Sequence, residues 1–159
     1  MHNGGFVFNG DAVTFSAFYY AYRTTSQSIA NTTRTAITFN ADIDTRSEWD
    51  AVGASLSPGI SFASDSSGHW LIVANVAFAA NSTGYRKVAI ELNGTEVAVA
   101  TVPSIGSAEE TWVHVSTIVP LYDETDIIKV FVYQNSGGAL NVISDVGNSP
   151  TCRMTRVGF

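Results

Sequence analysis

The feature that most constrains the fold is residues 126–138, which read Asp-Ile-Ile-Lys-Val-Phe-Val-Tyr-Gln-Asn-Ser-Gly-Gly. Side chains of a β-strand point alternately to its two faces. An antiparallel strand with one wet face therefore alternates apolar and polar residues. Between residues 127 and 133 both faces are apolar, apart from Lys129. We expect a strand whose second face is also covered, and in a chain of 159 residues the expected cover is another copy of the protein.

Composition supports a β-rich assembly component. Hydrophobic residues make up 45% of the chain and charged residues 14%, whereas an ordinary soluble domain carries about 25% charged residues. The length fits one domain with a real core. A net charge of −6, with Lys87 and Lys129 as the two lysines, argues against a nucleic-acid partner and against an anionic membrane surface.

The chain has one cysteine, Cys152, so it cannot form an internal disulfide. This fits cytosolic synthesis, and we expect Cys152 to be a small buried hydrophobe. The first ten residues show neither a basic start nor an apolar run, so no signal peptide is expected. The apolar stretches are far shorter than the roughly 20 residues of a membrane-spanning helix, so no membrane insertion is expected.

Short β-rich runs separated by Gly, Asn, Ser and Asp clusters predict an all-β sandwich or barrel. Residues 1–12 form a Gly- and Asn-rich arm that we expect to be flexible, and residues 13–159 form the domain. Residues 42–59 are interpreted as a long irregular connection, and Asn93-Gly94 as a hairpin turn. The expected strands are 13–23, 36–40, 60–63, 69–80, 85–92, 96–102, 111–121, 127–134 and 151–159.

Eight to ten strands in one domain favour an antiparallel jelly-roll sandwich. An immunoglobulin-like sandwich is the alternative, but the Cys…Trp…Cys spacing of that fold is missing. Antiparallel strands in chain order also place their connections alternately at two ends. The longest polar connections share one end, and binding function usually lies in such loops. These connections are 24–34, 81–84, 104–110 and 136–150.

An ordered set of short motifs resembles the globular head domain of complement component 1q, which has the tumour necrosis factor-like jelly roll. The resemblance covers about residues 14–159, and the Asn-x-x-Gly-x-Arg segment at residues 81–86 is similar to bacteriophage and bacterial members of the family. The motifs that carry the resemblance are residues 17–23, 27–29, 36–40, 49–50, 68–70, 81–86, 92–94, 126–133, 134–137 and 157–159.

The resemblance implies a ten-strand jelly roll that forms a bell-shaped homotrimer. It also implies that aromatic and aliphatic side chains of an inner sheet line the three-fold axis, and it interprets the strand at 127–134 as part of that sheet. The alternative for each side chain is an ordinary position in the core of one chain. The candidate trimer-interface residues are Phe18, Tyr20, Tyr22, Phe131 and Tyr133.

The sequence offers no pattern for catalysis, so we expect no enzyme and no cofactor. Its three histidines, His2, His69 and His114, have no partners at metal-ligand spacing, and no nucleophile or phosphate-loop motif is present. Some relatives bind calcium, but the acidic residues at 42–50 and 123–126 lack a recognisable ligand-loop spacing. We therefore assign no metal site.

The expected function is that of a virion structural protein, a homotrimeric capsid decoration (cement) protein of a bacteriophage. It would be made in the host cytoplasm and lie on the capsid surface. The expectation of a capsid protein rests on a Met-initiated chain that has a head domain and no fibre shaft. A trimer also matches the three-fold positions of a capsid. Phe6 and Phe8 of the arm would dock onto the major capsid protein or another virion protein. One alternative is the receptor-binding head of a tail or head fibre, touching a host glycan or protein. A bacterial surface or secreted binding module is the second.

Overall fold

The fold is known from a computed structural model. It describes residues 7–8, 11–12, 18–44, 49–51, 59–62, 67–122, 125–145 and 150–158. Within these residues the chain forms fifteen strands and no helix, and every strand pairing is antiparallel. This confirms the all-β antiparallel class. The count exceeds eight to ten because several strands are only two to four residues long.

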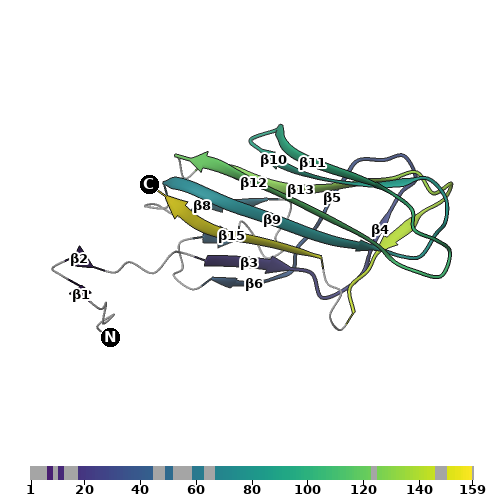
Figure 1. The fold of residues 1–159 in the computed structure, drawn as a ribbon, viewed down its shortest axis with the longest axis horizontal. Coiled ribbons are helices and arrows are strands. Elements are labelled where there is room, and N and C mark those ends of the chain that lie inside the picture. Colours follow the sequence, from purple (N-terminus) through teal and green to yellow (C-terminus); the bar gives the residue numbers. More distant parts are fainter. Residues whose placement is uncertain are drawn as a thin grey trace.

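One layer is a seven-stranded sheet that we call the β9 sheet. Its strand order is β4-β14-β9-β15-β3-β6, and β12 also pairs with β9. Strands β12, β9, β15, β3 and β6 lie side by side across the molecule (Figure 1). The strands are β3 (Phe18–Tyr22), β4 (Gln27–Ile29), β6 (Ala41–Asp44), β9 (Gly68–Phe78), β12 (Thr111–Leu121), β14 (Leu140–Val142) and β15 (Thr151–Gly158).

The second layer is a six-stranded sheet that we call the β13 sheet. Its order is β11-β10-β13-β8-β7, and β5 also pairs with β13. Near the N-terminus, β1 (Val7–Phe8) and β2 (Asp11–Ala12) pair with each other. The strands of the β13 sheet are β5 (Thr35–Ala36), β7 (Trp49–Ala51), β8 (Ile60–Phe62), β10 (Tyr85–Leu92), β11 (Thr95–Pro103) and β13 (Ile127–Gln134).

The core lies between the two sheets and takes alternate side chains from each. Tyr19 and Trp70 enter it from the β9 sheet, and Ile128, Val130 and Val132 enter it from β13; all are at most 1% exposed. The period-two pattern is visible in β13, whose even-numbered residues are buried while the odd-numbered ones stay partly exposed. This alternation gives each sheet an inner face and an outer face.

The expected strands match the structure best where the apolar pattern is longest. The bounds expected at 85–92, 111–121 and 127–134 are those of β10, β12 and β13. Two segments interpreted as connections instead carry short strands: 24–34 contains β4, and 136–150 contains β14. The connection expected over 42–59 is also wrong in part, since it contains most of β6 and all of β7. Such short strands gain their hydrogen bonds from a neighbour, which a local pattern cannot show.

The hairpin predicted at Asn93-Gly94 is confirmed, with φ of 51° and 83° at the two residues. The Asn93 side chain also ties this turn to a second one. Its Nδ2 donates to Asp126 Oδ1 at 2.6 Å, and its Oδ1 accepts from the Ile127 N–H at 2.8 Å. The pairings place these turns at one end of the sandwich and residues 81–84 and 135–138 at the other, as the alternation of connections predicts.

Gln134 anchors that other end from inside the core. It is fully buried, and its Nε2 donates to the carbonyl oxygens of Ile29 at 3.0 Å and Gly138 at 2.8 Å. Its Oε1 accepts from the Ser136 N–H at 2.7 Å. One side chain thus joins β4, the end of β13 and the turn that follows it. A buried amide is stable only when its polar atoms are paired in this way.

We predict that Gln134→Met lowers the free energy of unfolding by about 2 kcal/mol, because it keeps the length of the side chain and removes three hydrogen bonds. Chemical denaturation measures this loss. Lys129→Met on the outer face of the same strand is the matched control and should change stability by less than about 0.5 kcal/mol. Equal effects of the two substitutions would contradict the role given to Gln134.

Candidate interaction surfaces

The outer face of the β9 sheet carries an aromatic and aliphatic surface, which we call the β9 face. Cross-strand pairing aligns its side chains in rows, for example Tyr20 opposite both Ile43 and Arg153. A hollow of about 490 Å³ opens on it. The hollow is lined by Tyr20, Tyr22, Ile43, Asn75, Trp112, His114, Thr151 and Arg153.

Three aromatic side chains form a ladder along β3 on this face. The ring centroids of Phe18 and Tyr20 are 6.5 Å apart and those of Tyr20 and Tyr22 are 5.3 Å apart, with interplanar angles of 17° and 18°. Their neighbours in the strand, Tyr19 and Ala21, are fully buried in the core. The ladder therefore points away from the core of its own chain, and its rings are half-buried rather than enclosed.

A row of polar side chains crosses the middle of the β9 face. Asn75 Nδ2 donates to Thr151 Oγ1 at 3.3 Å, and Asn75 Oδ1 lies 2.6 Å from His114 Nδ1. The His114 ring stacks on Trp112, with centroids 6.1 Å apart. His114 lies at an exposed outward position of β12.

Charge is scarce on the β9 face. Among the described residues of β3, β9, β12 and β15, the outward positions hold no Asp, Glu or Lys, and Arg153 is their one formal charge. The Arg153 guanidinium carbon lies 5.0 Å from the centre of the Tyr20 ring. Ile43 is 52% exposed and Ile118 58% exposed. A solvated sheet face is not built in this way, because its outward positions are normally polar.

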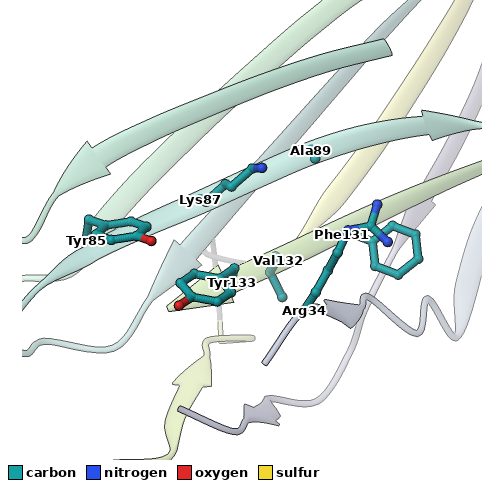
Figure 2. Close-up of a pocket in the computed structure, with 7 residues that line it drawn as sticks. All are labelled: Arg34, Tyr85, Lys87, Ala89, Phe131, Val132 and Tyr133. Atoms are coloured by element: carbon teal, nitrogen blue, oxygen red, sulfur yellow. The ribbon is translucent and has the colours of Figure 1, made fainter. Parts of the chain in front are cut away.

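A second surface, the β13 face, lies on the outer side of the opposite sheet. Figure 2 shows Tyr85 and Lys87 rising from β10, and Phe131 and Tyr133 from β13 beside them. Arg34 comes from the segment before β5 and lies over Phe131, with its guanidinium carbon 3.4 Å from the ring centre. These side chains, with Ala89 and Val132, enclose a cleft of about 280 Å³.

The five predicted trimer-interface residues do not share one face. Phe18, Tyr20 and Tyr22 lie together on the β9 face, whereas Phe131 and Tyr133 lie on the β13 face. The placement of residues 127–134 in the inner sheet is therefore wrong, because β13 pairs with β10 over seven registered positions and not with β3 or β15. The two groups lie in different sheets of the sandwich, and the trimer-interface role of all five residues stays a prediction.

Cover of this strand's second face by another copy of the protein stays a prediction. Its second face is apolar, and part of its cover comes from the same chain. Arg34 lies on Phe131, and the Tyr85 ring stacks on Tyr133 with centroids 5.6 Å apart. Tyr85 and Arg34 were missed as site residues because each lies far from β13 in sequence. The pairing of β10 with β13 brings Tyr85 to Tyr133, which no local pattern indicates.

The proposed docking arm falls mostly outside the described residues. Phe6 lies outside them, and Phe8 is described only as part of the backbone pairing of β1 with β2. The docking of Phe6 and Phe8 stays a prediction. In the described part of the chain, no three His, Cys, Asp or Glu side chains converge on a metal-sized site. No helix in that part has the length and hydropathy to cross a bilayer.

Comparison with solved structures defines the class: the fold is a tumour necrosis factor-like jelly roll. Murine APRIL at pH 5.0 superposes with a TM-score of 0.61 and 15% identity, and murine APRIL at pH 8.0 with 0.62 and 13%. Both matches cover 90% of this chain and 100% of the other. Eiger TNF from S. frugiperda has a TM-score of 0.57 and 7% identity, covering 90% and 92%. No family model and no curated protein sequence matches the chain.

Cys152 is fully buried in the core, as the sequence predicts. Burial removes the thiolate from water and raises the pKa of the Cys152 thiol to about 12. Because the thiolate is the nucleophile, a thiol with this pKa is almost wholly protonated, and inert, at neutral pH. Cys152 belongs to the same core cluster as Met154 and Ala74, and it packs there as an apolar side chain.

We predict that Cys152 in the folded protein at pH 8 resists a water-soluble thiol reagent and reacts stoichiometrically once the protein is unfolded in guanidinium. The rate in native buffer should be at least about 100-fold lower than in denaturant, since the sulfur is enclosed and protonated. The absorbance of the released chromophore measures both rates. Fast labelling of the native protein would show that the β9 sheet opens readily at β15.

Proposed function

We propose that the chain is a structural subunit that assembles with copies of itself through the β9 face. The observation that carries the proposal is the outward surface of β3, β9, β12 and β15. It combines an aromatic ladder with exposed aliphatic residues and lacks acidic residues and lysine at its described positions. Contiguous apolar surface of this kind marks protein contacts. The occupant we assign is a second copy of the same chain.

The size of the β9 face suits such a contact. Four strands at about 4.8 Å spacing and roughly eight residues of 3.3 Å rise give a flat area on the order of 500 Å². Side-chain relief increases the accessible area toward the roughly 800 Å² that each partner buries in a standard interface. Charge supports the same occupant. Copies with a net charge of −6 repel each other least where they meet on surfaces without carboxylates.

The two edges of the β9 face differ, and a ring of subunits can use this difference. The β3–β6 edge carries the tyrosine ladder and Ile43, whereas the β12 edge carries Trp112 and Ile118. A cyclic assembly sets one edge against the other edge of the next subunit, and this heterologous contact closes when the rotation fits. The homotrimer implied by the sequence resemblance is an arrangement of this type.

The expected native mass is three times 16.9 kDa. Tyr20→Glu or Ile118→Glu should lower the mass to that of one subunit, because each places an unpaired carboxylate in the contact. The matched control is Val99→Glu on β11, which is 49% exposed and lies in the β13 sheet. Native mass spectrometry measures all four proteins. A stable monomer of the unaltered chain overturns the proposal.

We further propose that this trimer is a virion structural protein that decorates a bacteriophage capsid. A three-fold assembly suits the three-fold and quasi-three-fold positions of a capsid. Its partner there would be the major capsid protein, contacted by residues 1–12. The sequence resemblance to bacteriophage members of the family supports the proposal. The neighbours among solved structures support only its fold.

Imaging of purified particles tests the location, and we expect density for this chain at capsid three-fold positions. Density confined to the tail would overturn the capsid assignment and favour the receptor-binding head of a fibre. Deleting residues 1–12 should abolish attachment to the capsid and leave the native mass at three subunits less the arms. A truncated protein that still binds the capsid would disprove the docking role of Phe6 and Phe8.

A further inference from the structure

The cleft on the β13 face exists because one small residue stands among large ones. Ala89 on β10 is registered opposite Phe131 on β13 and opposite Val99 on β11. The small Ala89 methyl group thus lies between the Phe131 ring and the Val99 side chain on the same outer surface. Side chains of registered residues lie about 5 Å apart, so the missing volume over Ala89 leaves a hollow. Its volume of about 280 Å³ is near the lower limit for small-ligand sites.

Two tyrosines form one wall of this cleft. The Tyr85 and Tyr133 rings stack with an interplanar angle of 21°. A hydrogen bond between their hydroxyls, followed by desolvation, raises the pKa of Tyr133. The Tyr133 phenol therefore stays neutral at physiological pH and keeps its hydrogen-bonding capacity beside the cleft. Tyrosine rings offer a flat apolar face and a polar edge at low entropic cost, which suits a ligand that is part apolar and part hydroxylated.

Two cations point into the same cleft, and no acidic residue is among the side chains that line it (Figure 2). Arg34 is held on the Phe131 ring while its Nη2 donates to Glu91 Oε2 at 2.7 Å. The Lys87 ammonium lies 3.3 Å from Glu96 Oε2. Neither carboxylate is among the side chains that line the cleft, and each is paired with one of the two cations. A guanidinium has five N–H donors and an ammonium three, so one carboxylate leaves each with donors to give.

We propose that this cleft binds one acidic sugar, a pyranose that carries a carboxylate, such as a uronic acid or a sialic acid of a glycan. The ring would lie against Tyr85 and Tyr133, and the carboxylate would meet Lys87 and Arg34. Guanidinium and ammonium groups bind carboxylates through charge-assisted hydrogen bonds. In a chain with a net charge of −6, two of the eight Lys and Arg residues meet at this one aromatic hollow.

The site is compatible with the proposed assembly and does not rest on it. The β13 face is on the opposite side of the sandwich from the β9 face, so self-association through the latter leaves the cleft open. One copy contains every residue of the site. Several copies in one assembly would bind a repetitive glycan with increased avidity. A single sugar should bind weakly, with a dissociation constant on the order of 1 mM.

The test compares two ligands that differ in one group. Glucuronic acid and glucose are titrated separately into ¹⁵N-labelled protein, and chemical-shift changes are followed at residues 85–89 and 131–133. We expect saturable shifts with glucuronic acid and at least about tenfold weaker binding of glucose, because glucose lacks the charged group. Sialic acid tests whether a second carboxylated pyranose is accepted. Raising the salt to 0.5 M should weaken binding of the acids and not of glucose.

Lys87→Gln is the informative variant, because the Lys87–Glu96 pair is partly exposed and its loss leaves the fold intact. It should weaken glucuronic acid binding about tenfold. Lys129→Gln is the matched control: it removes the same charge from the same sheet face but lies outside the cleft lining, and it should leave affinity unchanged. Ala89→Leu fills the hollow and should abolish binding of the acids.

Three results would overturn the proposal. The first is no saturable shift with either acid at 50 mM. The second is equal affinity for glucose and glucuronic acid, which would remove the role of the cations. The third is a polyglutamate peptide that binds in the cleft while both acidic sugars fail, which would assign the surface to an acidic protein segment. None of these results depends on the native mass, so the self-assembly proposal stands or falls separately.

Discussion

The packing of the β9 sheet against the β13 sheet is the constraint on which the rest of this molecule depends. Because side chains alternate across a strand, every residue that enters the shared core sends its neighbours to one of the two outer faces. Trp70, Tyr19 and Ile128 fill the core. The core thereby fixes Tyr20 on one outer face and Phe131 on the other. Once the core has taken every second side chain of a strand, the remaining side chains of that strand must lie on an outer face. This places both interaction surfaces.

The two outer faces are both aromatic but differ in how they carry charge. On the β9 face a ladder of rings adjoins aliphatic side chains, with Arg153 as the one formal charge on the described outward positions of β3, β9, β12 and β15. On the β13 face cations and carboxylates form partly exposed pairs beside the rings. A mostly apolar surface with one formal charge suits a permanent contact between like chains, whereas a small cleft with polar groups at fixed positions suits a small ligand. We therefore propose that assembly and recognition use separate surfaces of the one fold.

The class of fold and the long strands could be predicted from the sequence, because runs such as 111–121 and 127–134 are long enough to show the pattern of a β-strand by themselves. The sequence also predicted a strand that is apolar on both faces. It could not assign that strand to a sheet, since the choice between β10 and β3 as neighbours depends on long-range pairing that leaves no local trace. For the same reason the cleft was missed: Arg34, Tyr85 and Phe131 lie far apart in the chain and meet only through β-sheet register. The short strands β4, β7 and β14 are too brief to show any period.

The enclosure of Cys152 has a practical consequence for work on this chain. It is the only cysteine of the sequence, and its side chain extends from β15 into the core. The native protein therefore offers no accessible thiol to a labelling reagent. A cysteine introduced at one outward position becomes a unique attachment point. A spin label or fluorophore placed on either face would report on that face alone. The proposed contact between subunits and the proposed occupancy of the cleft can then be measured separately in the same protein.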